Sequence, residues 1–224
     1  MIITIDGPSA SGKSTVSRLV ADHLGFYYLN TGLMYRAVAY IAYTYLNIKE
    51  HQLRHLSKAT IDSITGSNNL VYQYNEKDGA VILYEGKNIT PFLKDALVDT
   101  LVSIISPQAV VRTAMVTMQQ SIAYQHDSVV EGRDVGTVVF PNADFKFYIT
   151  ASLDERAHRW QKDQEKRGHQ YSLDESRSYL QDRDYKDSNR SLSPLKKPDH
   201  AKEIDTTHKT IAHVVQQIIN TVKN

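Results

Sequence analysis

Short apolar runs alternate with helically spaced apolar positions from the start of the chain. The run Ile2 to Ile5 predicts a buried strand. Apolar residues then recur at helical spacing over the next turns, at Val16, Leu19, Val20 and Leu24. This order predicts a strand followed by a helix that packs against it.

A second strand and helix follow directly. Phe26 to Leu29 predicts a short strand, Asn30 to Gly32 a turn, and Leu33 to about Leu46 a largely apolar helix. Strands that alternate with helices are typical of α/β proteins with a parallel sheet.

The middle of the chain breaks this alternation. Two strand-like runs, Leu70 to Tyr74 and Ala80 to Tyr84, flank a turn that ends in Asp78-Gly79, a pair that favours hairpins. We therefore expect an inserted subdomain with a β-hairpin at about residues 60–100.

Beyond the hairpin, Ser106-Pro107 predicts the cap and first turn of a long helix. Its apolar face would carry Val110, Val111, Ala114, Met115, Met118 and Ile122. The β-branched and aromatic runs Val129-Val130 and Phe145 to Ile149 predict buried strands that complete the parallel core.

The segment from Asp154 to Lys197 is polar and helical. Ser172 to Glu175 forms a capping box, and the segment carries eleven basic and nine acidic side chains. This near balance favours a solvated helix pair with ion pairs over an RNA-binding arm. A final amphipathic helix is expected from about Lys209 to Val222.

Composition narrows the class of protein. The chain has 224 residues, 41% of them hydrophobic and 23% charged, and a net charge of +1. These values are typical of one globular domain over residues 1–224, and they give no electrostatic reason to expect nucleic-acid or membrane binding. The chain lacks cysteine and any apolar run of about 20 residues. We expect a soluble, cytoplasmic monomer that acts on small molecules.

The loop between the first strand and helix carries the clearest chemistry. It reads Gly7-Pro8-Ser9-Ala10-Ser11-Gly12-Lys13-Ser14 and is followed by Thr15, and all nine residues are candidates for binding ATP. Its setting between strand and helix is that of a P-loop, whose backbone N–H groups bind phosphates. Lys13 would reach the β/γ-phosphates and Ser14 would ligate Mg²⁺.

The remaining polar residues favour a small-molecule kinase over other P-loop classes. No Asn-Lys-x-Asp element for guanine is present, and nothing resembles the arginine finger of a motor. Transfer between two phosphorylated molecules needs several cations. Arginines suited to this task are Arg36, Arg112, Arg133, Arg156, Arg159, Arg183 and Arg190. The late ones predict a lid and following helix at about residues 154–190.

Three motifs together resemble the nucleoside monophosphate kinases, and within them the cytidylate kinase family. They are Asp6 to Ser14, Asn30-Thr31-Gly32 followed by Tyr35-Arg36, and Glu131-Gly132-Arg133-Asp134 with the run to Pro141. Glu155 to Arg159 and Arg183 to Arg190 are similar to that family's lid and the segment after it. The resemblance implies a three-layer α/β P-loop fold and ATP-dependent phosphorylation of CMP and dCMP.

The resemblance also implies residue roles. Arg36, Arg133 and Arg190 would bind the CMP phosphate. Ser103, Arg112 and Asp134 would face cytosine. A carboxylate can accept a hydrogen bond from the amino group of cytosine. Thr31 would contribute a hydroxyl to substrate binding, and Asp187 with Arg183 would hold the sugar. The catalytic set would be Lys13, Arg133, Arg156, Arg159 and Arg190, with the two lid arginines closing over the ATP phosphates.

Magnesium is the expected cofactor. Ser14 would bind it directly, and ATP oxygens and water would fill the other positions. Asp6 and Glu131 are candidates for the surrounding shell. The acceptor is already an anion, so no general base is needed.

Several alternatives stay open. The chain could phosphorylate AMP, UMP, dTMP or shikimate, or could be a non-catalytic ATP-binding module. Ser103 could be a plain polar residue on a helix, and Asp187 a helix-end charge. Surface ion pairs account best for Lys162, Lys166, Arg167 and Arg177. Departures from the family pattern at Leu93–Leu97 and Pro107 leave the contacts of those positions open.

Overall fold

A five-stranded sheet forms the centre of the fold. The computed structural model describes residues 1–66 and 69–223. The strand order is β2-β6-β1-β7-β8, with β1 at Ile2–Asp6, β2 at Tyr27–Asn30, β6 at Ser128–Gly132, β7 at Phe145–Thr150 and β8 at Lys202–Asp205. The β1–β7 and β7–β8 pairs are parallel. The expected α/β fold with a parallel sheet is confirmed.

The chain divides into two compact units. The first combines Met1–Phe26 with Val129–Asn224, and the second is Tyr27–Ser128. The sequence predicts one functional domain, with an acceptor subdomain at about residues 60–100 and a lid at about residues 154–190. These three expectations stay predictions.

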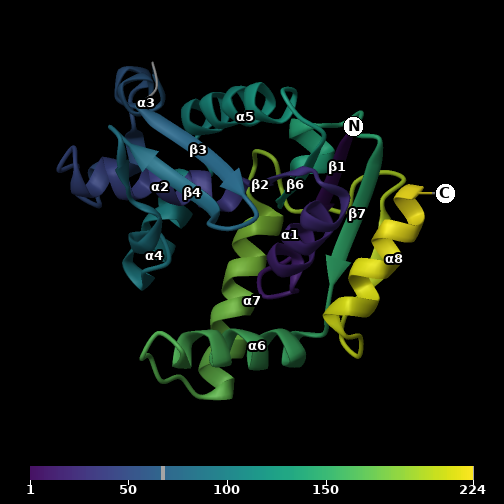
Figure 1. Cartoon of the computed structure of the whole chain (residues 1–224). Helices are drawn as coiled ribbons and strands as arrows, with labels where there is room; N and C mark the ends of the chain where they lie inside the picture. Colours follow the sequence, from purple (N-terminus) through teal and green to yellow (C-terminus); the bar gives the residue numbers. More distant parts are fainter. Residues whose placement is uncertain (67–68, 224) are drawn as a thin grey trace. The chain divides into compact units, whose positions relative to one another are not determined.

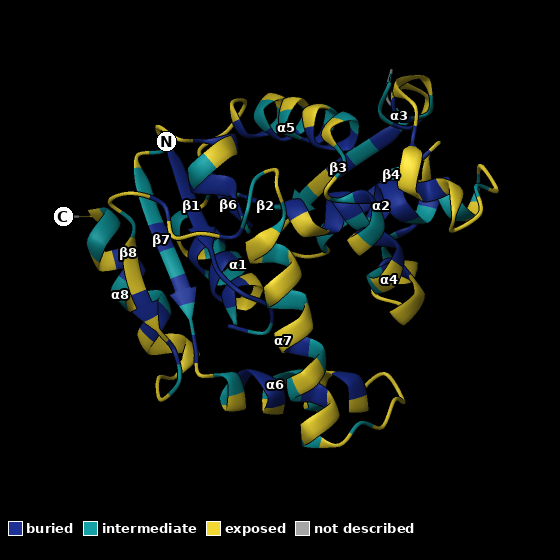
Figure 2. Cartoon of the chain, turned by 180° about the vertical axis from the view of Figure 1, so that it is seen from behind, coloured by how far each residue is buried: buried dark blue, intermediate teal, exposed yellow. Residues whose placement is uncertain are grey.

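The core of the first unit follows from the apolar patterns. Every residue of β1 is buried, as Figure 2 shows in dark blue. Two helices, α1 (Lys13–Leu24) and α8 (Ile211–Lys223), pack against each other (Figure 1). Each buries an apolar face, formed in α1 by Val16, Val20 and Ala21 and in α8 by Val214, Ile218 and Ile219. Both helices are therefore where their spacing predicts them.

Two polar helices of the first unit also match their prediction. They are α6 (Leu153–Glu165) and α7 (Leu173–Asn189), which pack against each other. The Ser172–Glu175 capping box is formed. Arg167 pairs with Asp163, and Arg177 pairs with Asp154 and Asp174, so both arginines form the expected surface ion pairs.

The described residues of the second unit form the hairpin and four α-helices. Its strands are β3 (Leu70–Asn75), β4 (Gly79–Tyr84) and β5 (Lys87–Asn88), and its helices are α2 (Thr31–Thr44), α3 (Lys58–Thr65), α4 (Ala96–Ile105) and α5 (Ala109–Ala123). Short turns of helix lie at Gln52–His55 and Thr90–Phe92, and a further one, in the first unit, at Val135–Val139. The strands β3 and β4 pair antiparallel, with Asn75 opposite Gly79, so the predicted hairpin is confirmed.

Two predicted boundaries in this unit are wrong. Asn30 to Gly32 is not a turn, because Asn30 Oδ1 accepts from Leu33 N at 2.9 Å and α2 already begins at Thr31. Ser106-Pro107 does not begin the long helix. Ser106 is the C-cap of α4, which is a separate helix. The long helix α5 begins at Ala109, after its N-cap Gln108.

The buried face of α5 matches the predicted stripe only in part, because Val111 and Met115 are buried and the other four residues of the stripe are partly exposed. Its buried residues are Val111, Arg112, Met115, Gln119 and Ala123. Within the described residues, no single helix is long and apolar enough to cross a membrane, and only the pair α4 and α5, bent by 104°, reaches that length and hydropathy jointly.

Candidate active site

The P-loop joins the end of β1 to α1 in a tightly constrained path. A Cβ on Gly7 would lie 2.0 Å from the Ile149 carbonyl oxygen of β7, so only glycine fits there. Ala10 and Gly12 both adopt left-handed backbone conformations, with φ of 58° and 89°. Successive N–H groups in such a turn form an anion-binding concavity.

Lys13 is buried against this loop. Its side chain donates to the Pro8 carbonyl at 2.9 Å, and the residue is only 6% exposed. Burial, with a further contribution from Arg133, lowers the pKa of Lys13 to about 7. A phosphate anion in the loop would favour the charged form of this amine.

Ser14 and Glu131 offer oxygen atoms next to each other. Ser14 Oγ donates to Glu131 Oε1 at 2.7 Å, and Glu131 comes from the buried strand β6. Hydroxyl and carboxylate oxygens are ligands that Mg²⁺ accepts. Among the described residues, no group of three or more histidine, aspartate or glutamate side chains could hold a metal ion. The Ser14 hydroxyl and the Glu131 carboxylate, side by side, would fit an ion that also accepts phosphate and water oxygens as ligands.

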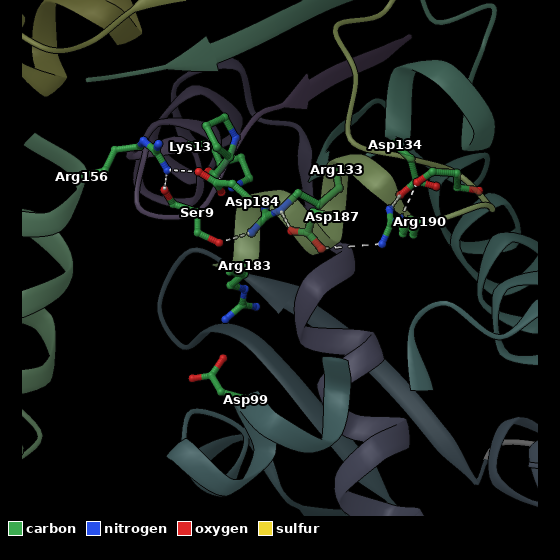
Figure 3. A network of polar contacts seen from close by, with 12 residues as sticks. Ser9, Lys13, Asp99, Arg133, Asp134, Arg156, Arg183, Asp184, Asp187 and Arg190 are labelled. Carbon is green, nitrogen blue, oxygen red and sulfur yellow. Dashed lines mark hydrogen bonds and ion pairs between the residues drawn. The ribbon is translucent and has the colours of Figure 1, made fainter. Parts of the chain in front are cut away.

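Arg133 connects the P-loop to α7. Its Nη2 donates to Ser9 Oγ at 2.7 Å and its Nε donates to Asp187 Oδ2 at 2.8 Å, as Figure 3 shows. Burial raises the pKa of Asp187, but Arg133, Arg183 and Arg190 outweigh burial and hold that pKa below its ordinary value. Asp187 is thus part of an ionic cluster and not a lone charge at a helix end.

Arg190 and Asp134 complete this cluster. Arg190 Nη2 lies 3.5 Å from Asp134 Oδ1, and Arg190 Nη1 lies 3.9 Å from Asp187 Oδ1 (Figure 3). Both side chains of the Arg190–Asp134 pair are 8% exposed. The structure brings together Arg133, Asp134, Asp187 and Arg190, four of the residues expected from the sequence.

Asp6 holds the chain that follows Asp134. Its two carboxylate oxygens accept from Val135 N at 2.8 Å and Gly136 N at 2.7 Å. Burial raises the pKa of Asp6 to about 6, although these two hydrogen bonds act in the opposite direction. Asp6 therefore fixes the turn beside Asp134, and its expected place near a metal ion stays a prediction.

The two expected lid arginines contact P-loop carbonyls. Arg156 Nη1 donates to Ser9 O at 3.2 Å, and Arg159 Nη1 donates to Ser11 O at 3.3 Å. Arg156 also donates to Asp184 Oδ2 at 2.5 Å. Arg183, the remaining candidate of α7, donates to Tyr179 Oη at 2.9 Å.

Two partners in this arrangement were missed by sequence reasoning. Asp184 forms an ion pair with Arg156. Its position next to the candidate Arg183 in the polar helix could have identified it from the sequence. Thr206 lies just after β8 and accepts from Arg159 Nη1 at 2.9 Å. No local pattern pointed to Thr206, because the strand that places it was not predicted.

The two arginine candidates of the second unit contact different partners. Arg36 pairs with Asp99 and donates to Leu93 O at 3.2 Å, which gives a contact to the divergent stretch Leu93–Leu97. Arg112 donates to Ser106 O at 3.2 Å and lies over the Tyr35 ring at 5.5 Å.

The two hydroxyl candidates of this unit differ in burial. Ser103 is exposed on α4 and donates to Thr100 O at 2.7 Å. Thr31 is buried in the first turn of α2. The substrate roles of Thr31, Arg36, Ser103 and Arg112 stay predictions.

The order of the motifs along the chain matches a known family. A family model described as cytidylate kinase matches residues 3–224. The chain belongs to the cytidylate kinase family. Its P-loop, the Arg133-Asp134 turn and the cluster on α7 all fall within the matched residues. A cytidylate kinase family member is a phosphotransferase that acts on nucleotides.

A solved structure with a TM-score above 0.5 supports the fold of this cytidylate kinase family member. An uncharacterized protein from Eubacterium ventriosum ATCC 27560 is 10% identical with a TM-score of 0.51, over 100% of this chain and 99% of that one. Shikimate kinase from Bacteroides thetaiotaomicron is 12% identical with a TM-score of 0.47, over 100% and 99% of the two chains. At such identities the likeness concerns the fold alone and says nothing of the acceptor.

Proposed function

We propose that this protein transfers the γ-phosphoryl group of ATP to CMP and dCMP, giving CDP and dCDP. The observation that carries the proposal is the cluster of Arg133, Asp134, Asp187 and Arg190 in the same unit as the P-loop. Arg133 bonds both Ser9 of the P-loop and Asp187 of α7. Membership of the cytidylate kinase family supports the same conclusion.

The cluster suits phosphoryl transfer because two polyanions must approach each other. Guanidinium groups bind phosphate oxygens through two parallel N–H bonds and stay charged at any working pH. Arg133 and Arg190 are already fixed by hydrogen bonds, so little reorganisation is needed when the acceptor phosphate binds. Positioning and charge stabilisation supply the catalysis, and no general base is required.

Asp134 is the proposed base-recognition residue. Its carboxylate can accept from the amino group of cytosine, whereas uracil carries an oxygen at that position. Arg190 lies 3.5 Å from Asp134, and its positive charge offsets the cost of burying this carboxylate. A site that recognises a hydrogen-bond donor rejects the analogue that lacks it.

The donor would bind as a magnesium complex. When bound, Mg²⁺ would offset the negative charge that develops on the phosphate groups. Ser14 Oγ would hold the ion, with Glu131 beside it at 2.7 Å. Lys13 and the P-loop N–H groups would orient the phosphates.

The test is ADP release from Mg·ATP with CMP, dCMP, UMP, AMP, dTMP and shikimate offered separately. Dominance of the two cytosine nucleotides is the expected result. Preference for another acceptor would keep the kinase and reject the assignment of Asp134. Binding of ATP with no turnover on any acceptor would instead indicate a non-catalytic ATP-binding module.

The variant Asp134→Ala sharpens this test. We expect kcat/KM for CMP and dCMP to fall about 100-fold more than kcat/KM for UMP, because only cytosine loses an acceptor for its amino group. Asp182→Ala, an exposed aspartate on α7, is the matched control and should remain within about twofold of the unaltered protein. An equal loss on every acceptor would remove Asp134 from base recognition.

A further inference from the structure

Thr206 connects three parts of the first unit through one hydroxyl group. Its Oγ1 accepts from Arg159 Nη1 at 2.9 Å. The same atom donates toward Ser11 O at 3.0 Å and Thr150 O at 3.1 Å. The residue is 4% exposed, so water does not replace these partners freely.

Arg159 strengthens the connection from the other side. Its Nη2 donates to the Thr206 carbonyl at 2.9 Å, and its Nη1 reaches Ser11 O at 3.3 Å. Glu155 accepts from Arg159 Nε at 2.9 Å and fixes the guanidinium plane. Arg159 and Thr206 therefore hold the Ser11 carbonyl together.

The direction of the Ser11 carbonyl decides what the next N–H group can do. Ser11 C=O and Gly12 N–H belong to one planar trans peptide, so they point in opposite directions. Fixing the carbonyl toward Thr206 fixes the Gly12 N–H toward the other side of the loop. P-loop N–H groups bind the phosphates of the donor nucleotide, and a rotated peptide would present a carbonyl oxygen to them.

We propose that Thr206 is a positioning residue for the donor nucleotide, which holds the Ser11–Gly12 peptide and Arg159 in the orientation that binds triphosphate. The inference rests on the proposed kinase function for its kinetic test. Its binding test needs only a nucleotide and no acceptor. Thr206 acts through the P-loop and Arg159 and is assigned no contact with the reacting atoms.

The experiment replaces the hydroxyl without changing the size of the side chain. Thr206→Val removes both hydrogen-bonding functions, whereas Thr206→Ser keeps the hydroxyl. Thr207→Val is the matched control, because Thr207 bonds Asp205 and Ser152 N but neither the P-loop nor Arg159. Thermal melting of each variant establishes that it is folded.

The readouts are the Kd for adenylyl-imidodiphosphate with Mg²⁺, measured by calorimetry, and the separate KM values for ATP and CMP. For Thr206→Val we expect Kd and KM for ATP to rise about tenfold, since a hydrogen bond to a charged group is lost. KM for CMP should stay within about twofold. Thr206→Ser and Thr207→Val should both remain within about threefold of the unaltered protein.

A double-mutant cycle with Arg159→Ala tests the proposed route. If Thr206 acts through Arg159 and the Ser11 carbonyl they share, the double variant should lose much less than the product of the two single losses. Unchanged ATP affinity in Thr206→Val, or an equal loss in Thr207→Val, would overturn the inference. An unaltered protein that binds the nucleotide but phosphorylates no CMP would instead reject the proposed function and leave the binding test of Thr206 intact.

Discussion

The two units hold their polar candidates in different ways. In the first unit, Arg133, Asp134, Asp187 and Arg190 contact one another or share partners, and Arg133 also bonds the P-loop. In the second unit, Arg36, Arg112 and Ser103 contact separate partners. Arg36 pairs with Asp99, and Ser103 bonds the carbonyl of Thr100 in its own helix.

This difference predicts how far the effect of a substitution spreads. A charge removed from a shared cluster leaves several partners uncompensated, and such losses are large and not additive. A charge removed from a pair outside such a cluster is expected to affect fewer charged groups. Substitutions in the two units should therefore differ in the size of their effect and in the kinetic constant that they change.

The largest effect is expected for Arg133→Ala. This change removes the bonds to Ser9 and Asp187 and a cation that would stabilise the transferring phosphoryl group. We expect kcat/KM for CMP to fall about 10³-fold, or about 4 kcal/mol of transition-state stabilisation. Steady-state kinetics with saturating ATP provides the measurement.

Arg177→Ala is the control for this prediction. Arg177 also lies on α7 but pairs with two surface carboxylates, Asp154 and Asp174, so its loss should change kcat/KM less than threefold. A fall of less than tenfold for Arg133→Ala would remove Arg133 from the catalytic set.

A smaller and more selective effect is expected for Arg36→Ala in the second unit. If Arg36 binds the acceptor phosphate, as the family resemblance implies, KM for CMP should rise about 30-fold while the affinity for ADP stays unchanged. Initial rates over a range of CMP concentrations, with the Kd for ADP, separate the two constants.

The exposed Arg54 of the same unit supplies the comparison through Arg54→Ala, which should behave as the unaltered protein. The opposite pattern, a lower melting temperature with an unchanged KM for CMP, would make the Arg36–Asp99 pair a structural one.

The same contrast explains how much the sequence could predict. The P-loop is contiguous, and its strand, loop and helix lie within the first 24 residues, so local pattern sufficed to place it. Arg133 and Asp134 were predictable because they directly follow a buried strand, where parallel sheets bind ligands. In the second unit, Ser103 was singled out by resemblance alone. Arg112 was named as one of several arginines, but its place facing cytosine came from the resemblance, and the boundary at Ser106-Pro107 was misplaced.

What could not be predicted depends on long-range contacts. Strand β8, Lys202–Asp205, buries only Ile204, so no apolar run marks it. Thr206 and Ser11 are 195 residues apart in sequence, and only the parallel pairing of β7 with β8 brings them together. The role of Thr206 needs the folded sheet and has no local signature.

The effect expected to be smallest near pH 7 is the uptake of a proton by Lys13 when nucleotide binds. Burial, and to a smaller extent the nearby charge of Arg133, lowers the pKa of Lys13 to about 7. The amine is therefore mostly neutral at about pH 8.5. Bound phosphate favours the charged amine, and binding of ADP should then take up close to one proton. Affinity should fall by about tenfold per pH unit above pH 7, because the binding form becomes rarer.

Calorimetry of ADP binding in two buffers with different ionisation enthalpies measures this uptake directly. The Lys13→Arg variant keeps a positive charge that does not titrate, so its binding should show no proton uptake and little dependence on pH. The stability of the folded protein depends on pH in the opposite direction to the nucleotide affinity. Lys13 titrates lower in the folded chain than its model value of 10.5, so it makes the ligand-free protein more stable as pH rises from about 7 toward that value. Equal binding enthalpies in both buffers for the unaltered protein would mean that Lys13 is already charged before nucleotide arrives. The P-loop would then bind phosphate without the protonation step that its burial implies.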